Sequence, residues 1–502
     1  VVLLNDIDMT GIETWTPIGD AVCPLTGTNA LTIESGRPFT GFFDGQGHSI
    51  RNFHMVCDNS TPNRAWGFFG ALGPGAVVEN LVFDASCSLA VKASKGTDCG
   101  ILAGVVYDAT VRNIVNNAPM SFDGSAGNVR MTMGMVGLAF ASKGVVLDRL
   151  TNEAALTSED GGNTGNGATG IHVGGICGFS TNLASSANPV IFNGCINRGD
   201  LTTKVGRASG IVAAANTFTH IVECENYGDM MNTYAGSKGG RLGNITCILG
   251  TQSIINGCTN HGDVVTTNSQ SHAGGLLCLS NATDCEIINS ANYGNVISDL
   301  TTYRGTLVAN INSLGKMDNN IAGGGIGSYN GGDYEMVAIN EMNFMDYIGK
   351  IKAGNEERVT NTKYGGEVST AKGIRTADDL VALAAAVNSG KPLGEWQNEN
   401  GEICLLTDID MSEVAEWTPI GKATFVIANN KLTVSGTPFA GHFNGQGYRI
   451  RNLKMVAANS EEGATYGLFG TLAPGAVIEN FSFDTGCSFT VASPAGSSNG
   501  VV

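Results

Sequence analysis

The sequence contains one long internal repeat, and that repeat most constrains how the chain folds. The segment LLNDIDMTGIETWTPIG at residues 3–19 returns as LLTDIDMSEVAEWTPIG at residues 405–421, and the similarity continues to the last residues at an offset of about 400. The 502 residues therefore hold one period and about the first hundred residues of a second copy. Since both ends lie inside the repeat, we expect a longer tandem array. Such an array extends over a long distance and presents the same surface several times.

Composition favours short strands separated by tight turns. The chain has 70 Gly, 12 Pro, few aromatic residues (7%) and few charged ones (15%), which is typical of such all-β proteins. At 502 residues, several domains or one elongated solenoid are expected rather than a single compact core. The net charge of −17 and the lack of a basic stripe argue against nucleic acid as a partner. No apolar run reaches the ~18 residues that a membrane span needs, so no membrane insertion is predicted.

A shorter period runs inside the long one and is marked by Asn-x-Gly triplets. The clearest triplets begin at Asn197, Asn226, Asn260 and Asn292, and Asp or Asn follows each of them. Asn and Gly accept left-handed backbone conformations, so we interpret the triplets as corners where a strand changes direction. A unit of about thirty residues buries one face only and must stack on its neighbours. A parallel β-helix satisfies this pattern, whereas the alternative, a β-propeller, needs about forty residues per blade.

Thirteen cysteines do not predict a disulfide framework here. Their number is odd, and Cys195, Cys224 and Cys258 each lie two residues before the Asn of a triplet. A recurring structural position fits a buried column of free thiols, because unpaired Cys behaves as a small hydrophobic residue. Neither a CxxC pair nor zinc-finger spacing occurs, which argues against a zinc site.

One helix is predicted, at residues 376–389. Thr376 with Asp379 resembles a capping box, and Gly390 supplies the C-terminal stop. The apolar stripe consists of Leu380, Leu383, Ala384 and Val387. Because the helix directly precedes the second LLTDIDM segment, we expect it to cover the open end of a coil.

These observations predict three parts. A β-helix repeat unit, truncated at its start, occupies residues 1–305 and is followed by a closing segment and linker at 306–370. The start of a second tandem unit occupies 371–502 and opens with the capping helix, followed by β-helix rungs.

Two recurring acidic pairs, Asp6-x-Asp8 and Asp408-x-Asp410, are candidates for calcium binding or catalysis. The first resembles the front of a calcium loop, but its twelfth position is Pro17 instead of Glu. Paired carboxylates also serve glycoside hydrolysis, although spacing along a strand does not show that they face a groove. We favour a structural role at strand ends, with calcium as the cofactor left open.

Trp15 and its copy Trp417 could stack on a sugar ring or pack over the end of the core, and we favour packing. The chain lacks HExxH, GxSxG and P-loop motifs. We therefore predict no catalytic, cofactor-binding or metal-binding residues.

The second copy carries a family resemblance. The GLFG element at Gly467 to Gly470, with FNGQGYRIRNL before it and GAVIENFSFD after it, resembles the GLUG repeats of bacterial surface proteins. These repeats also occur in non-proteolytic regions of IgA-cleaving metallopeptidases. The resemblance covers about residues 371–502, their copy at 1–110 and, more weakly, the turns up to 300. It implies a right-handed parallel β-helix exposed on a microbial surface, and the missing zinc motif means that peptidase activity is not carried over.

The function that we expect is a non-catalytic, structural or adhesive segment of a long tandem-repeat fibre on the cell exterior. Its expected partners are other copies of the same repeat or chain and, beyond them, glycans or a host or neighbouring cell surface. The acidic net charge opposes lateral packing unless cations bridge the chains. The alternatives are a carbohydrate-binding adhesin and a polysaccharide-active β-helix enzyme.

Overall fold

The computed structural model describes two compact units, Val1–Val368 and Ser369–Val502. It describes all residues except 27–29, 59–60, 93–95, 124–129, 159–169, 184–187, 205, 234–238, 281, 283, 331–332, 367–372, 375–376, 395, 399, 407, 413, 429–430, 458–462, 485, 493–497 and 500–502. The described residues form a parallel β-solenoid of about 11 turns with one short helix, so the predicted fold class is confirmed.

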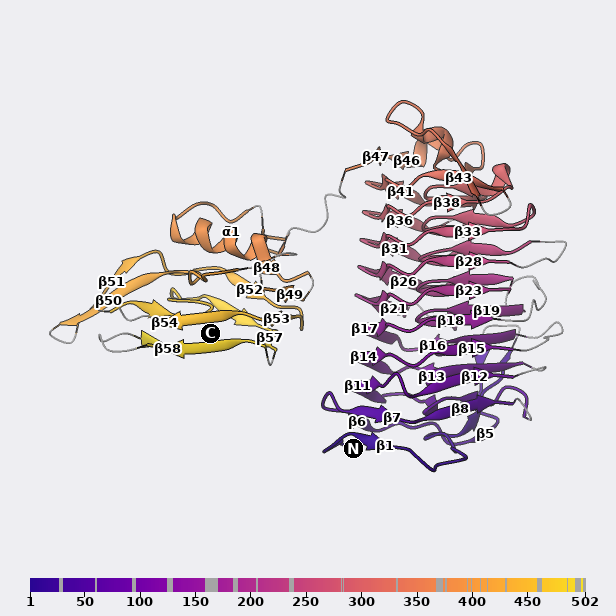
Figure 1. Ribbon diagram of the computed structural model, residues 1–502, viewed down its shortest axis with the longest axis horizontal. Helices are drawn as coiled ribbons and strands as arrows, with labels where there is room; N and C mark the ends of the chain where they lie inside the picture. Colours follow the sequence, from indigo (N-terminus) through magenta and orange to yellow (C-terminus); the bar gives the residue numbers. More distant parts are fainter. Residues whose placement is uncertain are drawn as a thin grey trace. The chain divides into compact units, whose positions relative to one another are not determined.

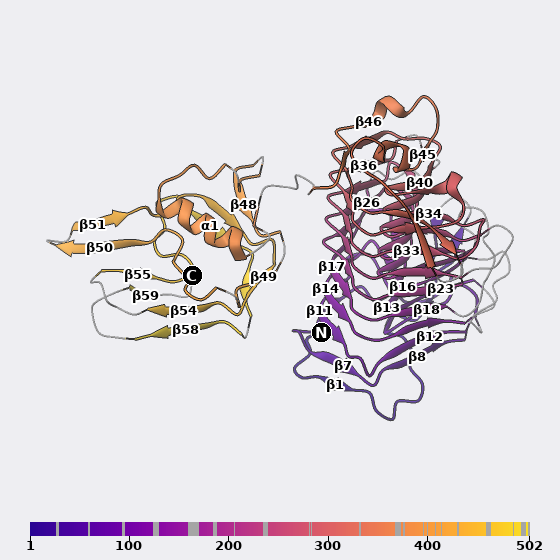
Figure 2. The same cartoon turned by 45° about the horizontal axis from the view of Figure 1, so that its top comes forward.

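The first unit stacks its turns into three sheets. The first of these sheets can be followed from β7 through β11, β14 and β17 in Figures 1 and 2. The first sheet contains β1 (Ile7–Asp8), β6 (Phe42–Asp44), β7 (Ser49–Arg51), β11 (Val77–Phe83), β14 (Thr110–Asn116), β17 (Val145–Asn152), β21 (Val190–Asn193), β22 (Ile196–Asn197), β26 (Thr219–Val222), β27 (Glu225–Asn226), β31 (Ile254–Asn256), β32 (Thr259–Asn260), β36 (Glu286–Ile288), β37 (Ala291–Asn292), β41 (Lys316–Asp318), β42 (Ile321–Ala322), β46 (Val359–Thr360) and β47 (Lys363–Tyr364).

The second and third sheets complete each turn. The second contains β9 (Ala65–Trp66), β10 (Phe69–Leu72), β13 (Thr97–Tyr107), β16 (Arg130–Ala141), β19 (Gly170–Gly174), β20 (Cys177–Asn182), β24 (Arg207–Ser209), β25 (Val212–Thr217), β29 (Arg241–Gly243), β30 (Thr246–Thr251), β34 (His272–Gly274), β35 (Leu277–Ser280), β39 (Arg304–Gly305), β40 (Val308–Ile311) and β45 (Lys350–Ile351). The third contains β8 (His54–Cys57), β12 (Ser88–Val91), β15 (Met120–Phe122), β18 (Leu156–Ser158), β23 (Leu201–Thr203), β28 (Met230–Asn232), β33 (Val264–Thr266), β38 (Val296–Ile297), β43 (Ile326–Asn330) and β44 (Asp333–Val337), of which β44 alone among these described strands runs antiparallel to its neighbour.

Smaller elements join these turns. They are the antiparallel pairs of β2 (Ala21–Val22) with β5 (Ser35–Gly36) and of β3 (Leu25–Thr26) with β4 (Ala30–Leu31), and the 3-10 turns Thr301–Tyr303, Phe344–Tyr347 and Glu356–Arg358. A continuous hydrophobic core fills the first unit from Met9 to Ile348. Inward residues from every turn contribute to it, as expected for a coil whose units bury one face each.

The asparagines of the Asn-x-Gly triplets form a buried ladder. Each Nδ2 donates to the Oδ1 of the equivalent asparagine on the next turn, at 2.8 Å from Asn197 to Asn226 and from Asn226 to Asn260. The same Nδ2 also donates to the carbonyl two residues later, for example from Asn226 to Gly228. The whole ladder comprises Asn116, Asn152, Asn197, Asn226, Asn260 and Asn292.

The predicted left-handed backbone at these triplets is wrong. Neither Asn226 nor Gly228 has a positive φ, and the same holds for the other three triplets. The asparagine is needed because its side-chain amide forms the ladder. The glycine is needed because the turns stack closely: a Cβ on Gly228 would lie 2.1 Å from the carbonyl oxygen of Gly199. Left-handed corners lie elsewhere on the turns, for example at Asn113 and Asn289.

The cysteines are buried free thiols, as predicted. No disulfide is present, all thirteen lie among the described residues, and each is buried except the half-buried Cys487. The thiol of Cys224 accepts a hydrogen bond from the backbone N–H of Cys195 on the preceding turn. Ser290 continues this column by accepting from the N–H of Cys258. The recurring cysteine therefore packs inward and also satisfies a backbone donor.

The coil continues beyond residue 305, through the range for which the sequence predicts a closing segment and linker. Strands β41 and β42 pair with β36 and β37, and β46 and β47 pair in turn with β41 and β42. The triplets do not reveal these turns because Ala322 occupies the position after Asn292 in the ladder. The Asn-x-Gly triplets therefore stop before the last parallel strands of the first unit.

The second unit begins with α1 (Ala377–Asn388), which packs on the hydrophobic core of that unit. Its predicted stripe is buried, and Gly390 closes the helix with φ +66°, whereas Thr376 lies outside the described residues. The strands are β48 (Glu402–Cys404), β49 (Ile409–Asp410), β50 (Ala423–Ala428), β51 (Lys431–Gly436), β52 (His442–Asn444), β53 (Arg449–Arg451), β54 (Lys454–Ala457), β55 (Thr465–Tyr466), β56 (Val477–Glu479), β57 (Ser482–Phe483), β58 (Ser488–Val491) and β59 (Ser498–Asn499). They stack in parallel apart from the β50–β51 hairpin.

Candidate functional site

The acidic pair near the N-terminus connects two turns of the solenoid. Asp6 accepts a hydrogen bond from the backbone N–H of Ser49 at 2.9 Å and one from the guanidinium of Arg51 at 2.7 Å. Asp8 accepts from the N–H and hydroxyl of Thr10 and from the side-chain amide of Asn52. These hydrogen bonds, led by that from the Thr10 hydroxyl, lower the pKa of Asp8 to about 2.

The second copy repeats this arrangement. Asp408 accepts from the N–H of Arg449 and from the guanidinium of Arg451, and Asp410 accepts from Ser412 and Asn452. Each carboxylate therefore holds the following turn in register. This is the arrangement expected from the structural interpretation, and it leaves fewer lone pairs for a cation or for acid–base chemistry.

Both tryptophans pack onto the core, as predicted. The indole of Trp15 stacks on Phe68 with ring centroids 5.2 Å apart and donates its N–H to the carbonyl of that residue. Trp417 donates to the carbonyl of Gly467 and packs against the core of the second unit. Trp15 therefore uses one ring face and its N–H to pack on the core.

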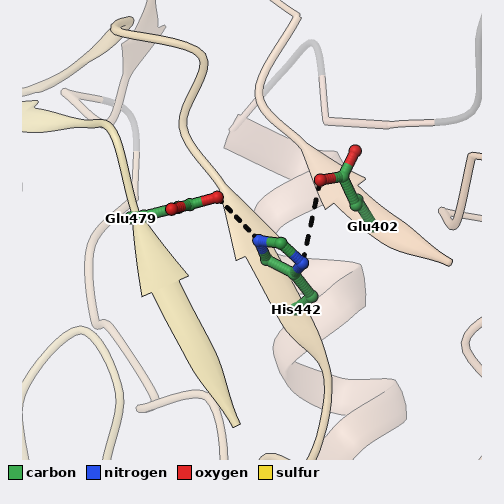
Figure 3. Close-up of side chains that lie close together, drawn as sticks. All are labelled: Glu402, His442 and Glu479. Atoms are coloured by element: carbon green, nitrogen blue, oxygen red, sulfur yellow. Dashed lines mark hydrogen bonds and ion pairs between the residues drawn. The ribbon is translucent and has the colours of Figure 1, made fainter. Parts of the chain in front are cut away.

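Among the described residues, one group of three His, Cys, Asp or Glu side chains could hold a metal ion: Glu402, His442 and Glu479. The three side chains come from the neighbouring strands β48, β52 and β56 (Figure 3). Nε2 of His442 lies 2.8 Å from Glu479, and Nδ1 lies 3.7 Å from Glu402. A hydrogen bond from Asn398 lowers the pKa of Glu402.

The geometry of this group favours an ion pair over a metal site. The two carboxylates face opposite nitrogens of the imidazole ring (Figure 3): Nε2 is within hydrogen-bond distance of Glu479, and Nδ1 makes a longer ion-pair contact with Glu402. The first copy has Phe42 in place of His442, and its Glu79 pairs with Arg112 instead. The group is therefore not repeated along the chain.

A concave site that no sequence motif predicts lies on the first unit. A cavity of about 590 Å³, open to solvent, is lined mainly by residues of the second sheet. Its described lining residues are Arg207, Asn216, Thr217, Arg241, Ile248, Leu249, Gly250, Thr251, His272, Leu279, Ala282, Asn310 and Asn312. We call it the arginine pocket. Its volume lies within the range of small-molecule sites.

Two arginines and one histidine of this pocket are the first residues of three successive strands. Arg207, Arg241 and His272 begin β24, β29 and β34, and the strand register places each beside the next. Each lies two residues before the small residue, Gly or Ser, at the start of a turn's apolar run. This spacing indicates that the three residues occupy equivalent positions on successive turns. It does not show that their side chains line one pocket.

Comparisons with known proteins give one partial match. No family model matches the chain, and no solved structure matches it. The chain is 34% identical over 112 residues, or 22% of its length, to halomucin of Haloquadratum walsbyi, a large surface glycoprotein. That stretch is 1% of halomucin. In the described part of the chain, no helix is long and apolar enough to span a membrane. The chain is thus a β-solenoid segment with weak, partial similarity to a surface protein.

Proposed function

We propose that this chain is a structural segment of a long extracellular fibre on the cell surface, built from tandem solenoid units and without catalytic activity. The observation that carries the proposal is the recurrence, in both copies, of the same bonds between turns. Asp8 to Asn52 in the first copy and Asp410 to Asn452 in the second are both 2.9 Å. A chain that rebuilds the same stacked coil about 400 residues later gains length without adding a new site.

The partial similarity to halomucin supports the surface location. It concerns 1% of that protein, so the fibre, its partners and its anchoring belong to the proposal. Equivalent units in one chain present one surface repeatedly, so weak contacts between chains add up through effective concentration. The expected partners are copies of the same chain, with glycans or neighbouring cell surfaces beyond them.

The proposed lack of catalysis is supported by the use of the acidic pairs. Asp6 and Asp8, the carboxylates that most resemble a catalytic pair, accept hydrogen bonds from the next turn. Turnover of a neutral or acidic glycan by the chain, lost in Asp6→Asn or Asp8→Asn but retained in Asp84→Asn, would contradict this part of the proposal.

The fibre is tested by immuno-electron microscopy of intact source cells, with antibodies against the first unit. Labelling of extended filaments outside the cell, at a regular spacing along each filament, is the expected result. Cells that lack the gene serve as the control. Label confined to the cell interior, or to isolated globules, would refute the proposal. Sequencing the whole gene gives an independent check, because a fibre requires further copies of the repeat.

A further inference from the structure

The first turn of the coil is built in the same way in both units. Isolated bridges join it to the next turn, and they are Ile18 with Phe69 and Phe39 with Leu72 in the first unit and Ile420 with Phe469 and Phe439 with Leu472 in the second. The apolar residues of this turn are also identical in the two copies. Leu3, Leu4, Ile7, Met9, Trp15, Ile18 and Phe39 recur as Leu405, Leu406, Ile409, Met411, Trp417, Ile420 and Phe439. A segment that packs on one of these turns therefore finds the same side chains on the other.

In the second unit the helix α1 covers this turn (Figure 1). The side chains of Leu380, Leu383 and Val387 on α1 belong to one hydrophobic core with Leu405 and Ile409 of the turn. Ile409 is only 1% exposed as a result. The apolar stripe of the helix and the first turn of the coil thus shield each other from water.

The last residue of the helix fixes its end on the turn. Nδ2 of Asn388 donates to the carbonyl of Pro419 at 2.9 Å, and Oδ1 accepts from the backbone N–H of Lys422 at 2.7 Å. Both partners are backbone groups, so this contact does not depend on the side chain at position 422. In the first copy the corresponding groups are the carbonyl of Pro17 and the N–H of Asp20.

A residue before the helix closes the edge of the turn. The N–H of Ile374 donates to the carbonyl of Cys404, and the carbonyl of Ile374 accepts from the N–H of Leu406, both at 2.8 Å. The corresponding edge groups of the first unit are the carbonyl of Val2 and the N–H of Leu4. An added extended residue pairs with such an edge through main-chain hydrogen bonds.

The first unit lacks this cover. No α-helix is present among its described residues, and Leu4, Ile7 and Ile12 are 79%, 38% and 53% exposed. Ile18 and Phe39 are only partly buried, whereas their counterparts in the second unit are fully buried. We call the surface formed by these five residues the end face. An exposed apolar surface of this kind is typical of a site that contacts another protein segment.

We propose that the end face binds a second α1 helix, together with the extended residue before it, from another copy of the repeat. The stripe of that helix packs on Ile7, Ile18 and Phe39, and the extended residue pairs with Leu4. The side chains that receive α1 in the second unit are identical here, which selects this helix as the partner. The chain's own α1 is not the partner, because it already covers the second unit. The origin of the helix in another copy rests on the proposed function, whereas the chemistry of the end face does not.

A synthetic peptide of residues 372–396 tests the end face. Fluorescence anisotropy of the labelled peptide is measured as the full chain is added. We expect saturable binding of one peptide per chain, since the corresponding site of the second unit is held by its own tethered helix. Bound peptide should also raise the thermal midpoint of the chain, because it binds the folded form. The absence of saturable binding overturns the proposal.

Peptide variants identify the face of the helix that binds. Leu383→Asp in the peptide should weaken binding at least tenfold, because Leu383 of α1 is fully buried in the second unit. Val381→Asp is the matched control, since Val381 is 40% exposed on α1 and the substitution introduces the same charge. Equal binding of the two variant peptides would show association without a specific face and overturns the proposal.

Variants of the chain locate the site. Ile7→Gln should lower the affinity for the peptide at least tenfold, whereas Val56→Gln, at an exposed valine of β8, should leave it unchanged. If Ile7→Gln does not give the wild-type circular dichroism spectrum, Leu4→Gln replaces it, because Leu4 is 79% exposed and lies outside the core. A several-fold loss is expected for that variant. Unchanged affinity in the folded end-face variants overturns the proposal.

The docking site and the fibre fail by different results. Peptide binding without labelled filaments refutes the fibre and retains the docking site. Labelled filaments without peptide binding refute the docking site alone. If the peptide does not bind but the full chain forms dimers in analytical ultracentrifugation, and Ile7→Gln abolishes them, the end face binds itself and the proposal is overturned.

Discussion

Asn197 and Asn226 are fully buried, and the side-chain amide of the first donates to the side-chain carbonyl of the second at 2.8 Å. The bond joins two successive turns of the solenoid. The same Nδ2 of Asn197 donates to the carbonyl of Gly199 at 2.9 Å. Both amide hydrogens are therefore used inside the core. A ladder of this kind fixes the register between turns, because a shift by one residue would leave buried polar groups unpaired.

Asn226→Ala should destabilise the first unit strongly. It removes the donor to Asn260 and to the carbonyl of Gly228, and the acceptor of Asn197. Each buried group left without a partner costs about 1–3 kcal/mol. Urea unfolding followed by circular dichroism measures the loss, and Asn5→Ala, at an exposed asparagine, is the matched control. Equal stability of the two variants would show that the ladder contributes nothing.

Gly262→Ala tests the close stacking of the triplet glycines. A Cβ at this position would lie 2.0 Å from the carbonyl oxygen of Gly228, a backbone atom of the preceding turn. The turns must separate locally, and overpacking of this kind costs about 1–3 kcal/mol. Gly394→Ala is the control because no atom lies within 4 Å of its added Cβ. Thermal unfolding of both variants should show a lower midpoint for Gly262→Ala alone. A wild-type midpoint would mean that the stack is looser than the structure indicates.

The repeating pattern predicts the solenoid but not the role of each recurring residue. Recurrence of Asn226 and Gly228 shows that these positions are equivalent, and the alternation of strand and turn then follows. The recurrence does not show whether the backbone at these residues has a positive φ. Asn is common both at left-handed corners and in buried ladders, so the motif alone does not distinguish the two. The left-handed positions, such as Asn113 and Asn289, carry no equally regular motif.

The arginine pocket could not be predicted for a related reason. Arg207, Arg241 and His272 meet only because the strands that they begin are in register, and the loops between them differ in length. The number of residues between Arg207, Arg241 and His272 therefore does not show that they lie side by side. The pairs Asp6-x-Asp8 and Asp408-x-Asp410 were found easily because the long repeat marks them, yet their partners lie on the following turn and were not predicted.

Asp318→Asn should reduce the acid sensitivity of the first unit. Hydrogen bonds from Thr360, and then from Lys316 and Asn361, lower the pKa of Asp318 to about 2. A lowered pKa contributes stability that is present above the ordinary value of 3.8 and is lost as the pH falls towards 2. The wild-type chain should thus be more stable than the variant at pH 6, and the difference should vanish near pH 2. Urea midpoints measured across this range test it. A difference that stays constant with pH would exclude the linkage.

Asp229→Asn should have the opposite pH dependence. Burial, and then the charges of Asp263 and Asp200, raise the pKa of Asp229. Its folded form therefore favours the proton, and stability falls as the pH rises from 3.8 through the raised value. Asn keeps the acceptor for the N–H of Asp263, as Asn295 does for Gly325 on a later turn. The variant should match the wild type near pH 3 and exceed it at pH 7. A variant that is less stable at pH 7 contradicts this assignment.

Thiol labelling of the native chain should be slow at the buried cysteines and faster at Cys487. Cys487 is half-buried, whereas the other twelve are buried, and burial raises the pKa of Cys23 to about 12. The thiolate is the reactive form, so burial limits both access and ionisation. Burial opposes ionisation of Cys247, but a hydrogen bond from Cys278, and then the positive charges of Arg207 and Arg241, lower its pKa. That thiol is nevertheless buried. With a thiol reagent at pH 8, one fast equivalent should be lost in Cys487→Ser, and all thirteen thiols should react in denaturant. Fast labelling of Cys247 in the native chain would contradict this prediction, because it would show that the solenoid opens locally around this buried thiol.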